Sequence, residues 1–290
     1  MTLPHLTQAQ APLTSEIDAV NEYGELHKVS IPAERALTVY VDKRELVTLM
    51  TLGANPELLV LGYLRNQRLV REVTDIESIT VDWEVGAAAV KTRHGIDDIE
   101  EKTAHRVVTT GCGQGSVFGG LMDEVDQIAL PADACIMQSQ LYALVNTIRL
   151  KETTYKSAGS VHACALFSTA SSEPEMLLFV EDVGRHNAID TIAGWMWMQE
   201  TRSVREADNV FYTTGRLTSE MVIKSAQMGV PVVVSRSGIT QMGHQVAQVV
   251  GLCTIGRATN KRFLCYTHAE RLKLQPGLIS MPSSSAKEPG

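Results

Sequence analysis

The feature that most constrains the fold is a regular alternation of short apolar runs and amphipathic helical segments over residues 137–272. Unbroken apolar runs, such as VPVVV at 230–234, are typical of strands buried on both faces of a parallel sheet. Helices must then cover both faces of that sheet. The alternation therefore predicts an α/β fold built on a mainly parallel sheet with helices on both faces.

The bounds of the expected elements follow from the apolar spacing and from candidate capping residues such as Thr218 and Thr240. Helices are predicted over residues 138–151, 186–198, 218–228 and 240–250. Strands are predicted over residues 161–168, 176–180, 209–212, 231–234 and 252–255, with a last extended run at 262–266. Upstream, three strands and a helix predict a smaller mixed α/β domain over residues 31–108, with the strands at 37–42, 76–81 and 86–92 and the helix at 56–66.

The remaining segments have compositions typical of tails and loops. Residues 1–30 have weak periodicity and residues 273–290 are rich in Pro, Ser and Gly, so both predict disordered tails. Residues 109–136 contain a cluster of glycines followed by Pro131, which predicts a mobile loop between the two domains.

Composition excludes several classes of protein. The 290-residue chain is 44% hydrophobic and 20% charged, which is typical of a folded globular protein. Its formal net charge of -7 argues against non-specific binding to nucleic acid or to a membrane surface, so any phosphate site must be local. No stretch approaches the ~20 apolar residues of a membrane span, and no signal peptide is recognisable, so we expect a cytoplasmic protein.

An arginine follows each of four predicted strands, at Arg185, Arg216, Arg236 and Arg257. The residue before each arginine is glycine or serine, which would let a ligand approach the backbone closely. In a parallel α/β sheet the ligand crevice lies beyond the carboxyl ends of the strands, so we expect these guanidinium groups to rim one crevice. Such a row suits a polyanion the size of a nucleotide or dinucleotide. The alternative is that each arginine pairs with a surface carboxylate.

Residues 181–187 read Glu-Asp-Val-Gly-Arg-His-Asn and bring acidic, basic and amide side chains to one turn. His186 has an ordinary pKa near neutrality, so this turn could relay protons or orient a ligand. In the alternative, Asp182 caps the following helix and His186 is solvated. His162 lies on an apolar strand and is either a satisfied buried histidine or a ligand.

The five cysteines are odd in number and widely spaced, without a C-x-x-C pair, so neither a disulfide framework nor a zinc ribbon fits. Four of them are expected to be small buried hydrophobic residues, namely Cys135, Cys164, Cys253 and Cys265. Cys112 differs because glycines flank it, which leaves its sulfur unshielded and allows backbone N–H groups to stabilise a thiolate. It is either a nucleophile or an incidental cysteine in a glycine turn.

Together these motifs resemble the formate dehydrogenase accessory sulfurtransferase (FdhD) family, sulfur carriers for molybdenum cofactor maturation. The resemblance spans about residues 33–270. It rests on the glycine-loop cysteine and on residues 159–163 (GSVHA), 179–190 (FVEDVGRHNAID), 214–216 (TGR) and 251–260. It implies a cytidine-deaminase-like α/β domain over residues 137–272 beside the smaller domain, and a homodimer.

By that resemblance, Cys112 would carry a persulfide taken from a cysteine desulfurase. The sulfur would pass to the molybdenum bis(molybdopterin guanine dinucleotide) cofactor, which formate dehydrogenase requires. The residues expected to bind this cofactor, or a guanine nucleotide as its analogue, are Ile255, Gly256, Arg257, Ala258, Thr259, Asn260, Arg185, His186, Gly215, Arg216 and Arg236.

Two departures from related patterns bear on mechanism. Family members often carry Cys-Gly-x-Cys-Gly in the loop, whereas residues 112–116 read Cys-Gly-Gln-Gly-Ser, so a handover between two loop thiols is disfavoured and a one-cysteine carrier remains. Residues 162–164 (His-Ala-Cys) lack the Glu of the deaminase H-x-E motif, and no P-C-x-x-C follows. We therefore expect neither deamination nor a zinc ion.

Three functions stay open from the sequence. The preferred one is a sulfurtransferase in which Cys112 reacts covalently. The second is a non-catalytic chaperone that binds the cofactor, with Cys112 incidental. The third is a nucleotide-dependent enzyme that acts through His186 and Asp182.

Overall fold

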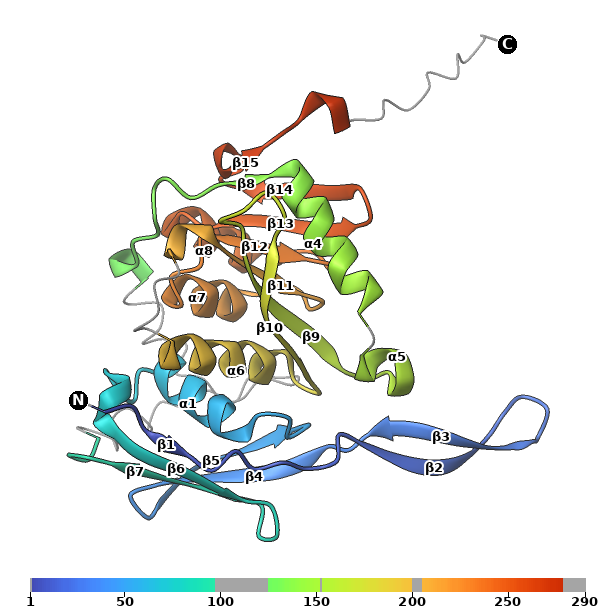
Figure 1. Ribbon diagram of the computed structural model, residues 1–290, viewed down its shortest axis with the longest axis vertical. Helices are drawn as coiled ribbons and strands as arrows, with labels where there is room; N and C mark the ends of the chain where they lie inside the picture. Colours follow the sequence, from blue (N-terminus) through green and yellow to red (C-terminus); the bar gives the residue numbers. More distant parts are fainter. Residues whose placement is uncertain (1, 97–124, 152, 200–204, 279–290) are drawn as a thin grey trace.

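The computed structural model describes residues 2–96, 125–151, 153–199 and 205–278. Its larger part is a six-stranded sheet in the order β10-β9-β11-β12-β13-β14 (Figure 1). The strands are β9 (His162–Ser168), β10 (Glu175–Asp182), β11 (Asn209–Thr213), β12 (Val232–Ser235), β13 (Cys253–Thr259) and β14 (Arg262–Thr267). Every strand predicted for this region is present, and the α/β fold is confirmed.

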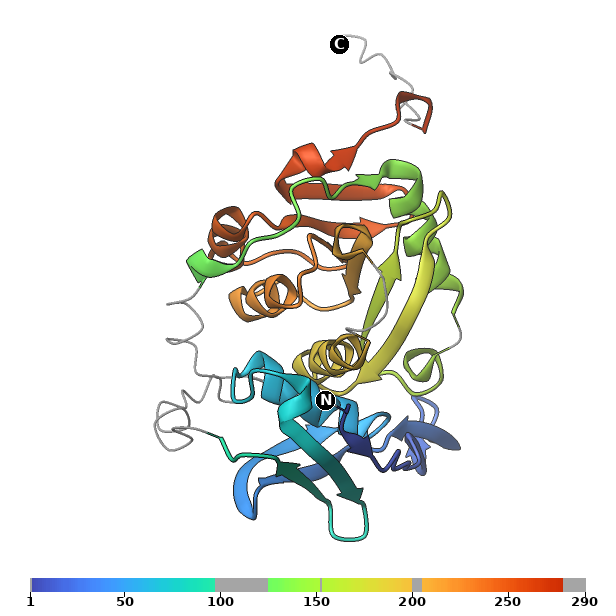
Figure 2. The same cartoon turned by 60° about the vertical axis from the view of Figure 1, so that its left-hand side comes forward.

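Helices cover both faces of this sheet, as predicted (Figures 1 and 2). One face carries α6 (Arg185–Met198), α7 (Ser219–Gln227) and α8 (Gln241–Val250), and their apolar side chains share one core with the sheet. The other face carries α4 (Gln138–Leu150), which packs over a second core. The short α5 (Thr154–Ala158) follows α4.

The sheet is mixed rather than mainly parallel. Among neighbouring strands, only β11 with β12 and β12 with β13 pair in parallel. Strand β9 is antiparallel to both β10 and β11, and β14 is antiparallel to β13. The reason is the length of the connections, because the few residues between β9 and β10 and between β13 and β14 are too short for a crossover helix.

The N-terminal part is a five-stranded sheet in the order β1-β6-β7-β4-β5. Its strands are β1 (His5–Leu6), β4 (Arg35–Val41), β5 (Arg44–Thr51), β6 (Ile76–Asp82) and β7 (Ala87–Thr92). Helix α1 (Pro56–Asn66) packs between this sheet and α6 (Figure 1). The remaining short elements are β8 (Ile136–Met137), β15 (Leu272–Lys273), η1 (Val73–Asp75), η2 (Val125–Gln127), η3 (Glu206–Asp208), η4 (Ala269–Arg271) and η5 (Pro276–Leu278).

The expectation of a disordered tail over residues 1–30 is wrong for the described residues 2–30. Strand β1 pairs with β6, and β2 (Thr14–Val20) pairs with β3 (Leu26–Pro32) in a hairpin that projects from the body (Figure 1). Both faces of this hairpin are largely exposed, so neither strand has the buried apolar face of a half-buried strand. At the other end, Lys273 belongs to β15, which pairs with β8, so the strand extends into the tail predicted over residues 273–290. Strand β8 begins at Ile136, so it likewise extends into the loop predicted over residues 109–136.

Two glycines set the distance between α1 and α6. A Cβ atom on Gly62 would lie 1.6 Å from the backbone oxygen of Asp190, and one on Gly194 would lie 2.0 Å from that of Leu58. The two helices therefore touch backbone to backbone, and any larger residue at either glycine would force them apart. In addition, Trp197 of α6 is buried in the core of the N-terminal sheet.

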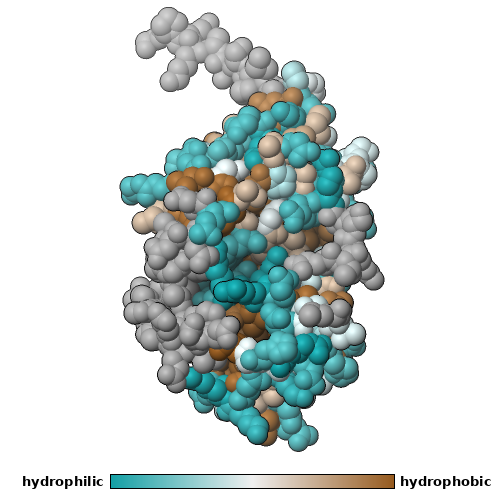
Figure 3. Space-filling view, turned by 90° about the vertical axis from the view of Figure 1, so that its left-hand side faces the viewer, coloured by the Kyte–Doolittle hydropathy of each residue, from teal (hydrophilic) through white to brown (hydrophobic). Residues whose placement is uncertain are grey.

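The outer surface is predominantly polar on the face shown in Figure 3, with hydrophobic residues in separate patches between hydrophilic ones. Within the described ranges, no helix has both the length and the apolar character that crossing a bilayer requires.

Candidate functional site: an arginine-rich sheet edge and its cavity

The four predicted arginines lie at one edge of the six-stranded sheet. Strands β10, β11, β12 and β13 run in the same direction, so their carboxyl ends share this edge, which we call the arginine edge. Arg216, Arg236 and Arg257 are exposed there, whereas Arg185 is half-buried. Among the described residues, no ion pair involves any of the three exposed arginines. Within the described part of the chain, these three arginines therefore do not pair with surface carboxylates.

Two of the small residues before these arginines, Gly215 and Gly256, are closely packed. Gly215 is buried, and a Cβ atom there would lie 3.1 Å from Cδ of Arg185. Gly256 is also buried, and a Cβ atom there would lie 2.6 Å from the ring of Tyr266 and 2.9 Å from the backbone oxygen of Ser237. The glycines thus allow neighbouring loops to close over the strand ends.

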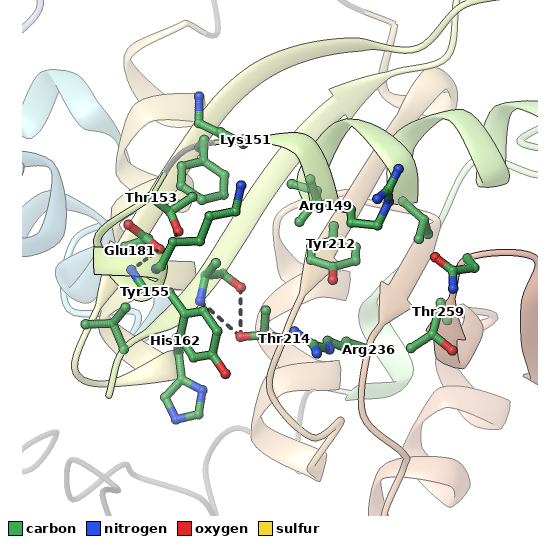
Figure 4. A pocket seen from close by; sticks show the side chains of 18 residues that line it. Arg149, Lys151, Thr153, Tyr155, His162, Glu181, Tyr212, Thr214, Arg236 and Thr259 are labelled. Carbon is green, nitrogen blue, oxygen red and sulfur yellow. Dashed lines mark hydrogen bonds between the residues drawn. The ribbon is translucent and has the colours of Figure 1, made fainter. Parts of the chain in front are cut away.

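A cavity of about 530 Å³ opens where the arginine edge meets the face covered by α4. It is lined by His162, Thr214, Arg236, Ala258, Thr259 and Asn260 from the sheet edge, and by residues of α4 and the segment after it. In Figure 4, Arg236 and Thr259 lie on one side of the view, and Lys151 and Tyr155 on the other. The buried Ile255 and Gly256 do not line this cavity.

The cavity concentrates positive charge in a chain whose net charge is negative. Arg149, Lys151, Lys156 and Arg236 line it together with one carboxylate, Glu181. The oxygens of Glu181 already accept hydrogen bonds from the backbone N–H groups of Thr154 and Tyr155, at 2.7 and 3.2 Å. The electrostatic character of the cavity therefore favours an anionic ligand.

A second, shallower depression of about 680 Å³ adjoins this cavity at Thr259. It contains Arg257, together with Lys261 from the turn between β13 and β14 and Arg262 at the start of β14. The rings of Tyr142 and Phe263 form part of its wall, with their centroids 6.2 Å apart. Arg236 and Arg257 thus face adjoining but separate depressions.

The pKa of His162 depends on burial and on the positive charges of the arginine edge. It begins β9, is half-buried, and lines the cavity. Burial lowers the pKa of His162, and the charges of Arg185 and Arg216 lower it further. The ring is therefore favoured in its neutral form, and an anion bound nearby would raise its pKa.

The structure places His186 in the protein interior rather than at the exposed part of the arginine edge. His186 is 2% exposed, and its Nε2 atom lies 3.2 Å from Oε2 of Glu220 on α7. Glu220 in turn lies 3.5 Å from Nζ of Lys224, which forms a fully buried ion pair with Asp190 at 2.9 Å. Neither the expected role in cofactor binding nor a solvated side chain fits this placement.

Asp182 joins the two parts of the molecule. Its Oδ1 accepts hydrogen bonds from Gly184 N at 2.9 Å and from Asn187 Nδ2 at 2.8 Å, at the start of α6. Its Oδ2 accepts from Thr51 Oγ1 at 2.5 Å and from Leu52 N at 3.1 Å, at the end of β5. Burial raises the pKa of Asp182, against the lowering effect of these four bonds. Both carboxylate oxygens are occupied, which argues against acid–base chemistry. The capping role is not what the structure shows either, because Gly184 is the N-cap of α6 and Asp182 accepts from the N–H of Gly184 rather than from the first turn of the helix.

The cysteines differ in environment. Cys112 lies outside the described residues. Burial raises the pKa of Cys164 to about 12, and Cys253 is also buried, as expected for both. Cys135 is exposed and Cys265 half-buried, so the expectation of burial is wrong for the first and only partly correct for the second.

Sequence reasoning missed the basic wall of the cavity. Arg149 lies near the end of α4, and Lys151 and Lys156 follow it. The density of basic residues at 149–156 was the available signal, but nothing local indicates that α4 ends beside the strand edge. Tyr212 also lines the cavity, and burial raises its pKa to about 12.

Comparisons with known proteins identify the family of this chain. The model of the FdhD/NarQ family matches residues 32–273. The chain belongs to the FdhD/NarQ family. Among its relatives, the sulfur carrier protein FdhD of Bacillus subtilis is 32% identical over 260 residues, covering 87% of this chain and 94% of the relative. The protein of the same name from Bacillus pumilus is 29% identical over 245 residues, covering 82% and 88%.

A solved structure supports the fold. The crystal structure of a formate dehydrogenase accessory protein from Desulfotalea psychrophila matches with a TM-score of 0.70 at 22% identity. The match covers 90% of this chain and all of that one. Family membership thus agrees with the resemblance seen in the sequence, and the solved structure agrees with the fold.

Proposed function

We propose that this protein is a cytoplasmic sulfurtransferase that supplies sulfur to the molybdenum bis(molybdopterin guanine dinucleotide) cofactor, as formate dehydrogenase requires. A cysteine desulfurase would be the donor, and Cys112 would carry the sulfur as a persulfide. The names of its relatives support a sulfur carrier. The observation that carries the choice of acceptor is the set of three exposed arginines at one sheet edge, without ion-pair partners among the described residues, beside a basic cavity.

The covalent step requires one thiolate. The Cys112 thiolate attacks the outer sulfur of the donor persulfide, forming a new S–S bond while the donor cysteine leaves as a thiolate. The carried sulfur is at the oxidation level of elemental sulfur. When the acceptor takes it, the S–S bond breaks and the Cys112 thiolate is regenerated. The absence of a second cysteine in residues 112–116 therefore does not prevent turnover.

The acceptor contains two pyrophosphates and two guanine bases, so it needs both cationic and planar contacts. Guanidinium groups provide paired donors for phosphate oxygens. Arg236 in the cavity and Arg257 in the adjoining depression supply such groups, and Thr259 and Asn260 lie next to them. Because Arg236 and Arg257 are exposed and make no ion pair with a described residue, binding would not first have to break one.

The second candidate is a non-catalytic chaperone that binds the same cofactor and delivers it to formate dehydrogenase. The missing second loop cysteine favours it. Both candidates use the arginine edge, and both are compatible with the homodimer that we expect from the family resemblance. They differ only in whether Cys112 reacts.

The experiment that separates them uses a strain that lacks this protein. Cys112→Ser should leave binding of guanosine diphosphate unchanged but should abolish formate dehydrogenase activity. Cys135→Ser, which changes an exposed cysteine among the described residues, is the matched control and should restore full activity. Full activity with Cys112→Ser would refute sulfur transfer through this residue and favour the chaperone.

A further inference from the structure

Two cysteines on neighbouring strands lie with their sulfur atoms in contact. The Sγ atoms of Cys253 on β13 and Cys265 on β14 are 3.9 Å apart. Cys265 pairs with Ile255 across the strands, and Cys253 precedes Ile255 by two residues, so both side chains lie on one face of the sheet. A disulfide bond is about 2.05 Å long, so the sulfurs would have to approach by roughly 1.9 Å.

The local backbone allows such a movement. The pairing of β13 with β14 shifts in register next to these residues, between Thr254 and Ile255. A bulge of this kind leaves one residue unpaired and bends the strand, so the two strands can adjust without breaking a regular ladder. In addition, β14 is the edge strand of the sheet, with a neighbouring strand on one side only.

The two sulfurs are chemically unequal. Cys253 is fully buried, whereas Cys265 is half-buried. The hydrogen bond between the sulfurs raises the pKa of Cys253 and lowers that of Cys265, and burial raises the pKa of Cys253 further. Since the thiolate is the reactive form, we expect Cys265 to react first with an external disulfide and Cys253 to react second.

We propose that Cys253 and Cys265 form a reversible dithiol–disulfide pair, in which Cys265 reacts first with a small-molecule disulfide and Cys253 completes the exchange. In the first step, the Cys265 thiolate attacks one sulfur of the disulfide, forming a mixed disulfide and releasing one thiolate. In the second step, Cys253 loses its proton and attacks Sγ of Cys265, forming the internal bond and releasing the second thiolate. The two protein thiols are oxidised, and one disulfide is reduced to two thiols.

The internal bond would tie β13 to β14 directly before residues 256–260, which form part of the segment proposed to contact the cofactor. Because the pair includes neither Cys112 nor the arginines, the test of this proposal is independent of the test of sulfur transfer. It would give the β13–β14 hairpin a reduced form and a more constrained oxidised form.

The test equilibrates the full-length reduced protein in buffers of defined ratios of oxidised to reduced glutathione. Samples are quenched in acid, alkylated, digested and analysed by mass spectrometry. We expect a peptide pair linked through Cys253 and Cys265 that disappears when the ratio is lowered. Hydrogen exchange of the β14 amides should slow in the oxidised protein, and unchanged exchange would contradict the constraint on the hairpin.

Single variants test the order of the two thiols. In Cys253→Ser, or in Cys253→Ala if the buried hydroxyl prevents folding, Cys265 should accumulate as the mixed disulfide with glutathione. In Cys265→Ser, Cys253 should remain a free thiol.

Cys164 is the internal reference, because burial raises its pKa to about 12 and keeps it a thiol at neutral pH, whereas the pKa of Cys265 is lowered. Absence of the linked peptide would overturn the proposal. So would modification of Cys265 no faster than Cys164, or a Cys253→Ser variant that leaves Cys265 unmodified.

Discussion

Replacing Asp182 with Asn should destabilise the protein although the two side chains have the same shape. Asp182 accepts four hydrogen bonds, two on each oxygen, from groups at the end of β5 and the start of α6. Asn keeps one acceptor oxygen and presents an NH₂ group to the other two donors. Each buried donor left without a partner costs about 1–3 kcal/mol, so the loss is about 2–6 kcal/mol before the relief from burying a neutral group.

We expect a net loss of about 3 kcal/mol in the free energy of unfolding, which lowers Tm by roughly 6–12 °C for a chain of this size class. Thermal unfolding followed by circular dichroism measures it. Asp133→Asn makes the same chemical change at a side chain that is 67% exposed, and it should stay within about 0.5 kcal/mol of the wild type.

A double-mutant cycle with Thr51→Val tests the contact itself, because Thr51 donates to Asp182 at 2.5 Å. The combined loss should be smaller than the sum of the single losses. If Asp182→Asn unfolds at the wild-type temperature, or if the two losses simply add, the reasoning about this carboxylate is refuted.

Three further predictions concern the helix contact and the arginine edge. Gly194→Ala should lower the free energy of unfolding, measured in urea, by about 1–3 kcal/mol, because its Cβ atom would lie 2.0 Å from a backbone oxygen of α1. Gly238→Ala, whose nearest contact would be 4.0 Å away, should be neutral, and equal stability of the two variants would contradict the close packing. Arg236→Ala should weaken binding of guanosine diphosphate by about 1.5–3 kcal/mol, or roughly 10–150-fold by calorimetry, because Arg236 lines the cavity. Arg205→Ala, which removes an ion-paired arginine, should not weaken it, and equal effects would argue against a site at the arginine edge. The pKa of His162, followed by NMR, should lie below its ordinary value of 6.5 and should rise in Arg216→Ala. Between the folded and unfolded pKa values the unfolded chain binds more protons, so His162 lowers the stability of the fold as the pH falls through that window. An unchanged pKa in the variant would contradict the effect of Arg216 on His162.

Elements with strong local signals were predictable from the sequence. Helix α1 begins and ends at the predicted residues because Pro56 starts it and its apolar residues recur at helical spacing. Strand β5 was missed because Asp42 and Lys43 form the turn before it with positive φ angles of 46° and 72°, where a glycine would have been the recognisable signal.

Long-range relationships were not predictable in the same way. The direction of β9 depends on its pairing with β10 and β11, and its own residues fit either direction. The arginine edge was predictable because each arginine lies near or just beyond the carboxyl end of a strand, and strand direction then places them together. The burial of His186 was not, because its partner Glu220 lies on another helix.

The central claim is that sulfur travels on Cys112. Incubation of the reduced protein with a cysteine desulfurase and cysteine, followed by mass spectrometry of the digested protein, tests it directly. The account predicts a peptide containing Cys112 that is heavier by one sulfur atom, is restored to its original mass by a reductant, and is unmodified when Cys112 is replaced by Ser. A sulfur adduct found instead on Cys135 or Cys265, or none on any cysteine, would contradict it.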